Sequence, residues 1–331
     1  MPTYAAIDID QGRCVGVEKA RAPLPPGSLR LAVAASGVNR ADLHQRAGHY
    51  PPPPGASPIL GLEAAGAVIE VGEGVTGWSV GDRAMALLAG GGYAAEVVVA
   101  AEHALPIPDG VADEVAAAFP EVFATAWLNL VGEGRLADRP QPSSVLLHAG
   151  ASGVGTAAIQ LCRLLGHASF ITAGSPEKIA FARSLGADGG TDRHAGPWAD
   201  AVAAWRPEGV DVILDPVGAA YLSDNLRALA DDGVLIAIGL LGGRTSPLDL
   251  GVLLRKRARI VGSTLRNRSD ATKAALMRDL AQHVIPAWSA GTIAPVIDRV
   301  YDVADVEEAH ARMASNATIG ALVLRWPRRT G

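Results

Sequence analysis

The segment from Ser144 to Leu165 constrains the fold more than any other part of the sequence. It reads SVLLHAGASGVGTAAIQLCRLL, an apolar run followed by a glycine-rich turn and then by residues with helical periodicity. Glycines in such a turn let the backbone approach a diphosphate, and the following helix offers it free N–H groups. The segment therefore predicts a strand, a phosphate-binding turn and a helix of a dinucleotide-binding βαβ unit. A tight turn without a ligand is the alternative interpretation.

Short apolar runs alternate with helical stretches between residues 122 and 265. The runs are continuous, as expected for strands that are buried on both faces of a sheet. We expect strands at Ser144–His148, Ser169–Thr172, Val210–Leu214, Val234–Ile238 and Ile260–Gly262. We expect helices at Thr156–Leu165, Pro176–Leu185 and Tyr221–Leu229. This order predicts an α/β domain with a doubly wound parallel sheet.

The remaining residues have a different texture. Residues 1–121 are rich in glycine and proline, and their β-like runs fall at Leu29–Ala35, Ala65–Val71 and Tyr93–Val99. Residues 266–331 combine expected helices at 271–285 and 303–314 with an expected strand at 320–324. We therefore expect a mostly β domain made of residues 1–121 and 266–331. The dinucleotide-binding domain, residues 122–265, is inserted in it.

The end of the second strand of the βαβ unit distinguishes NADP from NAD. NAD-binding proteins usually place a carboxylate there, about 20 residues beyond the turn, to bind a ribose hydroxyl. This sequence has Gly174 at that position. Ser175, Lys178 and Arg193 follow, and they suit the 2′-phosphate of NADP, which a carboxylate would repel. The sequence therefore favours NADPH, although Lys178 is also explained as an exposed helix lysine.

The overall composition argues against several classes of protein. The chain has 331 residues, a net charge of −5 and two cysteines, Cys14 and Cys162. A mildly acidic chain suits neither nucleic acid nor an anionic membrane, and two cysteines form neither a disulfide framework nor a four-cysteine zinc site. We find no signal-peptide pattern and no uninterrupted apolar stretch long enough to span a bilayer. We expect a cytoplasmic protein.

Four segments of the chain carry recognisable motifs: GVNRADLHQRAGHYPPPPGASPILGLEAAG, beginning at Gly37, and LLHAGASGVGTAAIQL, TAGSPEK and IGALVLRW further along the chain. These segments resemble those of the medium-chain dehydrogenases/reductases. Within that superfamily they are most similar to the zinc-free, zeta-crystallin-like NADPH:quinone oxidoreductases. The resemblance implies a GroES-like, mostly β domain carrying a Rossmann dinucleotide-binding domain.

Two positions that hold catalytic zinc in alcohol dehydrogenases of this superfamily are changed. Asn39 stands where those enzymes have cysteine, and Leu62 stands where they have histidine. Neither side chain is a zinc ligand, so the resemblance implies a metal-free branch. Two departures from the branch itself are Arg193, where many members have tyrosine, and Ala321, where many have lysine. The first departure favours binding of a 2′-phosphate.

Three side chains are candidates for contact with the reacting groups. Tyr50 precedes a run of four prolines, which stiffens its loop, and its phenol can bond the acceptor oxygen or donate a proton. A purely hydrophobic anchor is the alternative. Asn39 takes a former ligand position and can orient the nicotinamide or the acceptor, or serve only the structure. The resemblance also implies that Ser152 contacts the nicotinamide side, whereas a helix N-cap is its simpler role.

Further cofactor contacts follow from the rule that ligands bind at the carboxyl ends of parallel strands. The turn itself contributes Gly150, Gly153 and Val154, and later strand ends contribute Val217, Gly239, Leu240, Thr264 and Leu265. The resemblance adds Thr125 and Asn316. His148, at the end of a buried strand, is expected to be a hydrogen-bonded core histidine rather than a ligand.

The expected activity is reduction of quinones by NADPH without a metal. Reduction of α,β-unsaturated aldehydes or ketones on the same scaffold is the alternative, because both reactions deliver hydride to a conjugated carbonyl. A more remote alternative is an NADPH-binding structural or RNA-binding protein, supported only by the basic run Arg255–Arg259, which we interpret as a solvated helix end. The resemblance implies a homodimer paired near Ile260–Ser263. Leu248, Leu250, Val252, Leu253 and Leu254 are the apolar neighbours expected there.

Overall fold

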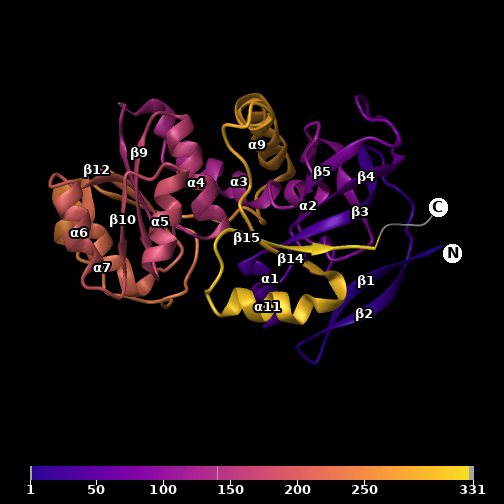
Figure 1. The fold of residues 1–331 in the computed structure, drawn as a ribbon, viewed down its shortest axis with the longest axis horizontal. Helices are drawn as coiled ribbons and strands as arrows, with labels where there is room; N and C mark the ends of the chain where they lie inside the picture. Colours follow the sequence, from indigo (N-terminus) through magenta and orange to yellow (C-terminus); the bar gives the residue numbers. More distant parts are fainter. Residues whose placement is uncertain (1, 140, 328–331) are drawn as a thin grey trace. The chain divides into compact units, whose positions relative to one another are not determined.

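The computed structural model describes residues 2–139 and 141–327 and divides the chain into two compact units (Figure 1). Unit 1 contains the residues up to Ala124 together with those from Arg266 onward, and unit 2 is Thr125–Leu265. The division falls inside helix α3 (Pro120–Trp127), three residues after the boundary at 121/122 that the sequence predicted. Because the helix is continuous, one turn of it belongs to each unit.

Unit 1 is built on a seven-stranded sheet with the order β14-β15-β3-β4-β5-β7, in which β6 also pairs with β3. Its strands are β3 (Ser28–Val38), β4 (Glu63–Val71), β5 (Arg83–Leu87), β6 (Glu96–Ala100), β7 (Ala104–Pro106), β14 (Ile297–Asp302) and β15 (Ala321–Arg325). A separate antiparallel pair is formed by β1 (Thr3–Asp10) and β2 (Arg13–Ala20). The helices are α1 (Arg40–Arg46), α2 (Asp113–Ala116), α9 (Asp270–His283), α10 (Ile285–Ser289) and α11 (Val306–Ala314).

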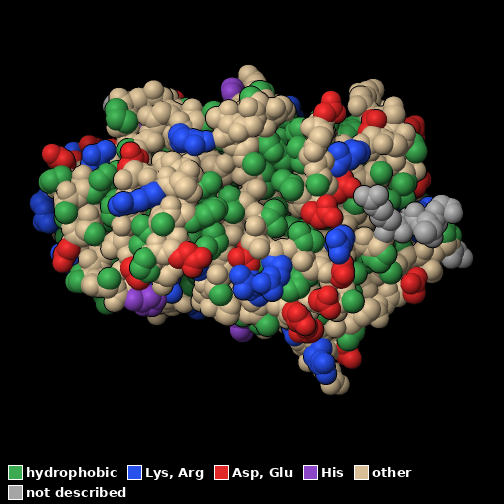
Figure 2. Space-filling view, viewed as in Figure 1, with side chains coloured by type: hydrophobic (Ala, Val, Ile, Leu, Met, Phe, Trp, Pro, Cys, Tyr) green, Lys and Arg blue, Asp and Glu red, His purple; other side chains and the backbone are tan. Residues whose placement is uncertain are grey.

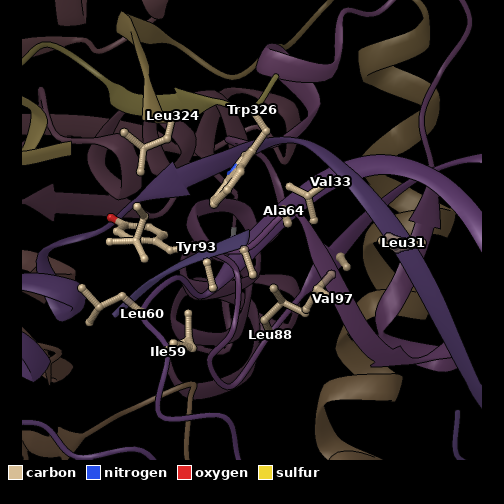
Figure 3. Packing of buried hydrophobic residues seen from close by; sticks show 14 of the residues in the cluster. Leu31, Val33, Ile59, Leu60, Ala64, Leu88, Tyr93, Val97, Leu324 and Trp326 are labelled. Carbon is tan, nitrogen blue, oxygen red and sulfur yellow. The ribbon is translucent and has the colours of Figure 1, made fainter. Parts of the chain in front are cut away.

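The C-terminal segment completes this sheet. Strand β15 pairs antiparallel with β3, and Trp326 donates a hydrogen bond from Nε1 to Ser36 Oγ at 3.0 Å. Figure 3 shows Trp326 and Leu324 packed with Tyr93 and Leu60 in the buried core of unit 1. The predicted strand at Tyr93–Val99 is wrong at its start, because the observed strand begins at Glu96. Tyr93 instead lies in a buried loop segment.

Strands β3 and β4 approach each other closely at Gly66. The register of the pair shifts between Val33 and Ala35, so Gly66 faces an irregular part of β3. A Cβ atom at Gly66 would overlap the carbonyl oxygen of Ala32. The glycine is therefore required by backbone packing at the centre of the sheet.

Unit 2 is a six-stranded, fully parallel sheet in the order β10-β9-β8-β11-β12-β13, which confirms the predicted doubly wound fold. The strands are β8 (Ser144–Leu147), β9 (Ala168–Ala173), β10 (Gly189–Asp192), β11 (Val210–Asp215), β12 (Leu229–Ala237) and β13 (Arg259–Gly262). The helices are α4 (Gly153–Leu164), α5 (Pro176–Leu185), α6 (Trp198–Trp205), α7 (Leu222–Ala228) and α8 (Leu250–Lys256).

Helices cover both faces of this sheet (Figure 1). Helices α6, α7 and α8 pack on the face that carries Leu146, Phe170 and Leu235. Ile171 points the other way, and a Cβ added at the neighbouring Gly190 would meet both Ile171 and Ile179 of α5. The sequence missed β10, because its residues GGTD form an edge strand without an apolar run.

One segment, Asp113–Glu133, has the length and composition of a membrane-spanning helix. Of its most apolar window, 67% is buried inside the protein, which is typical of a core helix. Phe119 and Phe123 in this segment are fully buried and stack on each other with ring centroids 4.4 Å apart. Its apolar character is therefore accounted for by packing within the protein.

Candidate cofactor and acceptor sites

Two glycines of the turn in unit 2 occupy positions that leave no room for a side chain. Ala149 has the left-handed φ of 52°, and a Cβ at Gly150 would overlap the side chain of Ile171. A Cβ at Gly155 would lie 2.6 Å from the carbonyl oxygens of Ala149 and Gly150. Packing within the turn and against β9 therefore requires glycine at both positions, and the turn ends at the N-terminus of α4, where backbone N–H groups can bind a diphosphate. The residues present fit a dinucleotide.

Ser152 is the N-cap of α4. Its Oγ accepts a hydrogen bond from the backbone N–H of Gly155 at 3.1 Å. The structure therefore shows the simpler of the two roles expected for Ser152, that of a helix N-cap. Gly153 and Val154 form the first turn of α4 and keep partial exposure, and a contact of these three residues with a cofactor stays a prediction.

A buried hydrogen-bond network lies beside the turn. His148 bonds Thr172 Oγ1 through Nδ1 at 2.9 Å and Asn225 Oδ1 through Nε2 at 2.7 Å. Burial lowers the pKa of His148 to about 4, so the ring is neutral. This arrangement confirms the expectation of a satisfied core histidine.

The same network holds the loop after β11. Asn225 Nδ2 donates to Asp215 Oδ2 at 2.9 Å, and Asp215 accepts hydrogen bonds from the backbone N–H groups of Val217 and Gly218. Burial is the main cause that raises the pKa of Asp215, and these donors oppose it. Val217, a predicted cofactor contact, is therefore anchored to the strand ends of the sheet.

Four residues expected at the 2′-phosphate gather at the end of β9. A Cβ at Gly174 would lie 3.1 Å from Nη1 of Arg193, so the absence of a side chain lets the guanidinium reach across this position. Ser175 caps α5 by accepting from the N–H of Lys178 at 3.4 Å. Arg193 is exposed and Lys178 is partly exposed. The arrangement offers a cationic, hydroxyl-bearing surface to a phosphate.

The other predicted cofactor contacts are distributed over several elements. Gly239 and Leu240 follow β12, and Thr264 and Leu265 follow β13; parallel pairing brings these strand ends to the same edge of the sheet as the turn. Thr125 lies in α3. Asn316 belongs to unit 1, where it has a left-handed φ of 57° and accepts from Nη2 of Arg40 at 2.6 Å. Their roles stay predictions.

In unit 1, the two replaced ligand positions lie in a cluster of buried carboxyl groups. Asn39 precedes α1, and its Nδ2 donates to Glu63 Oε1 at 2.8 Å. Its backbone N–H donates to Asp42 Oδ2 at 2.7 Å, and Leu62 is fully buried. A Cβ at Gly37 would overlap the Glu63 carboxyl group, which explains the glycine in this motif. Within residues 2–139 and 141–327, no group of three His, Cys, Asp or Glu residues is arranged to hold a metal ion.

The sequence did not predict this carboxyl cluster. Glu63 Oε2 accepts from the backbone N–H of Glu121 at 2.9 Å, and Asp42 accepts from Gly61 N at 3.0 Å and from the Tyr93 hydroxyl at 3.2 Å. Burial is the largest cause in each case, raising the pKa of Asp42 to about 6, that of Glu63 to about 8 and that of Glu121 well above its usual range. The only sequence cue was the position of Glu63 directly after Leu62.

Tyr50 is held by Arg266. The guanidinium lies 5.4 Å from the centroid of the Tyr50 ring, and Arg266 donates to the carbonyl oxygens of Tyr50 and Ala89 at 3.3 and 2.8 Å. Tyr50 is partly buried, which raises the pKa of its phenol, so the hydroxyl keeps its proton at neutral pH. The Tyr50 loop is thus fixed by a cation as well as by the prolines that follow it.

A GroES-like unit that carries a parallel sheet with a glycine-lined turn defines a class of NAD(P)-dependent oxidoreductases. A family model described as "Alcohol dehydrogenase GroES-like domain" matches residues 25–109, and one described as "Zinc-binding dehydrogenase" matches residues 153–282. The human "Synaptic vesicle membrane protein VAT-1 homolog" is 31% identical over 318 residues, covering 91% of this chain and 80% of that protein. The chain belongs to the medium-chain dehydrogenase/reductase family.

Other similar proteins differ in size and in their described activity. The "Polyketide synthase GfsB" of Streptomyces halstedii is 36% identical over 93% of this chain, but the chain spans only 5% of it. A mycobacterial protein solved in complex with NADPH is 28% identical, with a TM-score of 0.86 over 97% of this chain and 99% of that one. A quinone oxidoreductase of Pseudomonas syringae pv. Tomato DC3000 is 27% identical, with a TM-score of 0.85 over 98% and 100% of the chains.

Proposed function

We propose that this protein is an NADPH-dependent, metal-free reductase of quinones in the zeta-crystallin-like branch of its family. The observation that carries the proposal is the pair of sites in unit 2: a glycine-rich turn at the N-terminus of α4 for the diphosphate, and Arg193 reaching across Gly174 for the 2′-phosphate. The similar structures with NADPH and with quinone oxidoreductase activity support the same cofactor and acceptor. Asn39 and Leu62 at the former ligand positions support chemistry without zinc.

The proposed reaction depends mainly on positioning. When bound, NADPH supplies the hydride that reduces the acceptor. The turn and the N-terminus of α4 bind its diphosphate, and the Asp215 network fixes the loop at Val217. In unit 1, Glu63 fixes the amide of Asn39, and Arg266 fixes the ring of Tyr50 against which a flat acceptor can pack.

Comparison of acceptors tests the proposed function. We will measure the loss of NADPH absorbance with a panel of 1,2-quinones and a panel of 2-alkenals. Quinones are expected to be turned over with the higher kcat/KM. Faster turnover of alkenals would assign the enone reductase activity instead, and stoichiometric zinc in the purified protein would contradict the metal-free mechanism.

The remote alternative of an RNA-binding protein finds little support in the basic run. Arg257 pairs with Asp231 and Asp232, and Lys256 donates to the carbonyl oxygens of Arg227 and Leu229. On the face shown in Figure 2, Lys and Arg side chains are interspersed with Asp and Glu. We propose a small-molecule acceptor as the partner and the cytoplasm as the compartment.

Replacement of Tyr50 by phenylalanine tests the role of its hydroxyl. We expect kcat/KM for the quinone to fall roughly two- to tenfold, the effect of removing one hydrogen bond to the acceptor oxygen. Tyr4→Phe, in β1, serves as the control and should leave the rate unchanged. An unchanged rate in Tyr50→Phe would leave the ring with a stacking role only.

The edge of the unit 2 sheet carries an apolar surface that we propose as a homodimer interface. Exposed apolar side chains lie on β13, on α8 and on the segment that joins β12 to α8: Leu241, Leu248, Leu250, Leu254 and Ile260. Val252 and Leu253, also expected there, instead pack against the core of unit 2. The unpaired edge of β13 can pair with its copy across a twofold axis.

A charge placed in this surface is expected to separate the dimer. Leu254 is 75% exposed, and burial of one leucine contributes about 2 kcal/mol for each of the two copies. Leu254→Asp should therefore shift the protein from dimer to monomer in light scattering. Val80→Asp, at a 67% exposed site of unit 1, should not. A monomeric parent protein would disprove the interface.

A further inference from the structure

We propose that Glu121 donates the proton that accompanies hydride transfer, and that Arg266 stabilises the carboxylate left behind. The inference rests on the proposed function and names a second catalytic group for it. Glu121 was not singled out by the sequence, and it takes no part in the roles given above to Asn39, Tyr50 and Ser152.

The position of Glu121 places it among the candidate acceptor residues. It is the second residue of α3, and its N–H bonds Glu63 Oε2 at 2.9 Å, while the other oxygen of Glu63 holds Nδ2 of Asn39 at 2.8 Å. Glu63 therefore joins Glu121 to the residue that takes a former ligand position. Thr125, the expected nicotinamide contact, follows four residues later, on the same face of the helix as Glu121.

Two buried polar atoms in this neighbourhood have no hydrogen-bond partner among the residues that the structure describes. They are Oε2 of Glu121 and Nη2 of Arg266. The Arg266 side chain is buried, with a residue exposure of 2%, whereas Glu121 keeps partial exposure. Buried polar atoms in folded proteins are almost always paired, so an acid and a cation that both have unused capacity indicate a site for a polar group of a ligand. Glu121 and Arg266 also interact electrostatically, and the ligand group of the proposal is a carbonyl oxygen of the acceptor.

The charges around Glu121 decide its protonation. Burial raises the pKa of its carboxyl group, and the carboxyl groups of Glu63 and Asp42 raise it further. Arg266 and Lys273 act in the opposite direction, and Tyr50 also interacts with Glu121. The net shift is well above the usual range, so Glu121 is a neutral acid at neutral pH. A neutral carboxyl group has a proton to donate, and a nearby cation stabilises the anion that forms.

The proposed step balances. Hydride addition to a quinone or an enone brings two electrons and one hydrogen to the acceptor and leaves a negative charge on its oxygen. The O–H bond of Glu121 breaks as an O–H bond forms on that oxygen, so the acceptor gains one hydride and one proton. The positive charge of Arg266 then stabilises the Glu121 carboxylate until a proton from solvent restores the acid.

Glu121→Gln is the main test, with Glu102→Gln as a control at an exposed glutamate. We expect kcat to fall roughly 10²–10⁴-fold in Glu121→Gln, with no change in the dissociation constant of NADPH measured by its fluorescence. The parent protein should lose activity as the pH rises through the pKa of Glu121, because only the protonated form donates. This decline of activity at high pH is the basic limb of the pH–rate profile. Glu121→Gln should lose the basic limb together with the solvent deuterium isotope effect, and Glu121→Asp should restore part of both.

The outcomes separate this role from the proposed function. If Glu121→Gln keeps both its turnover and the loss of activity at high pH, the role of Glu121 is overturned and the proposed function is not. The same conclusion follows if Tyr50→Phe loses both of them instead. If Glu121→Gln fails to fold, Glu121→Asp and the isotope effect of the parent protein decide: a parent protein without an isotope effect or a basic limb overturns the proposal. A parent protein that oxidises NADPH with neither quinones nor enones overturns both.

Discussion

Gly174→Asp is expected to reverse the preference of the protein from NADPH to NADH. The new carboxylate would lie beside Arg193, since a Cβ at this position is already 3.1–3.2 Å from the guanidinium atoms. It would pair with the cation that we assign to the 2′-phosphate and would repel the phosphate itself. It would also offer an acceptor to the ribose hydroxyls of NADH, as in NAD-binding members of this fold.

The size of this change follows from the contacts involved. One charge-assisted hydrogen bond contributes about 1.5–3 kcal/mol, so its loss with NADPH and its gain with NADH together shift the preference by roughly 3 kcal/mol or more. The ratio of kcat/KM values for the two cofactors should therefore change by about a hundredfold or more. The atoms that the new side chain would crowd are at the end of the flexible Arg193 side chain, which can move aside. The fold should therefore tolerate the aspartate.

Gly174→Asn is the matched control for this change. Asparagine has nearly the size of aspartate but carries no charge, so it should weaken NADPH binding moderately and leave NADH without the full gain. If Gly174→Asp and Gly174→Asn change the cofactor preference equally, steric crowding dominates and Arg193 does not bind the phosphate. An unchanged preference in both variants would refute the whole assignment.

Gly66→Ala is expected to have the largest effect on stability. Its Cβ would overlap the carbonyl oxygen of Ala32 and would lie 2.9 and 3.0 Å from the Ala32 carbonyl carbon and the Ala34 nitrogen. These are backbone atoms at the centre of the unit 1 sheet, so no side-chain rotation relieves the overlap. We expect the free energy of unfolding to fall by about 3 kcal/mol and the melting temperature by roughly 6–12 °C.

Gly16→Ala tests whether this loss is specific. Gly16 lies in β2, and a Cβ there meets no atom within 4 Å. Calorimetry should therefore show little change for Gly16→Ala and a large one for Gly66→Ala. Similar melting temperatures for the two variants would show that β3 and β4 can separate at the register shift without cost.

The architecture of unit 2 was predictable because each of its buried strands is a continuous apolar run. The run from Val145 to Leu147, together with the glycines that follow it, located the turn, and Gly174 marked the end of the second strand. Edge elements escaped prediction, since β10 is too polar to show a buried pattern. Tyr93 was assigned to a strand because aromatic residues favour strands, but its buried hydrogen bonds to Asp42 and His310 hold it in a loop.

The candidate acceptor residues were less predictable than the cofactor turn. Asn39 and Leu62 were found because they depart from known ligand positions. Glu121, in contrast, belongs to no local motif. It reaches Glu63 only because β4 and α3 meet in three dimensions, across 58 residues of sequence. A sequence pattern contains no information on this contact between distant residues. It also contains none on the burial that keeps the Glu121 carboxyl group neutral.

The pairing of β15 with β3 has a consequence for synthesis on the ribosome. Unit 2 is continuous in sequence and has all its strands once residue 265 has emerged. The sheet of unit 1 gains two of its seven strands only when residues 297–325 have been made. Until then, residues 35–38 of the long strand β3 have no partner at the edge that β15 will occupy, which makes the nascent chain prone to wrong strand pairing. We therefore expect a protease-resistant unit 2 to form while unit 1 is still open to attack.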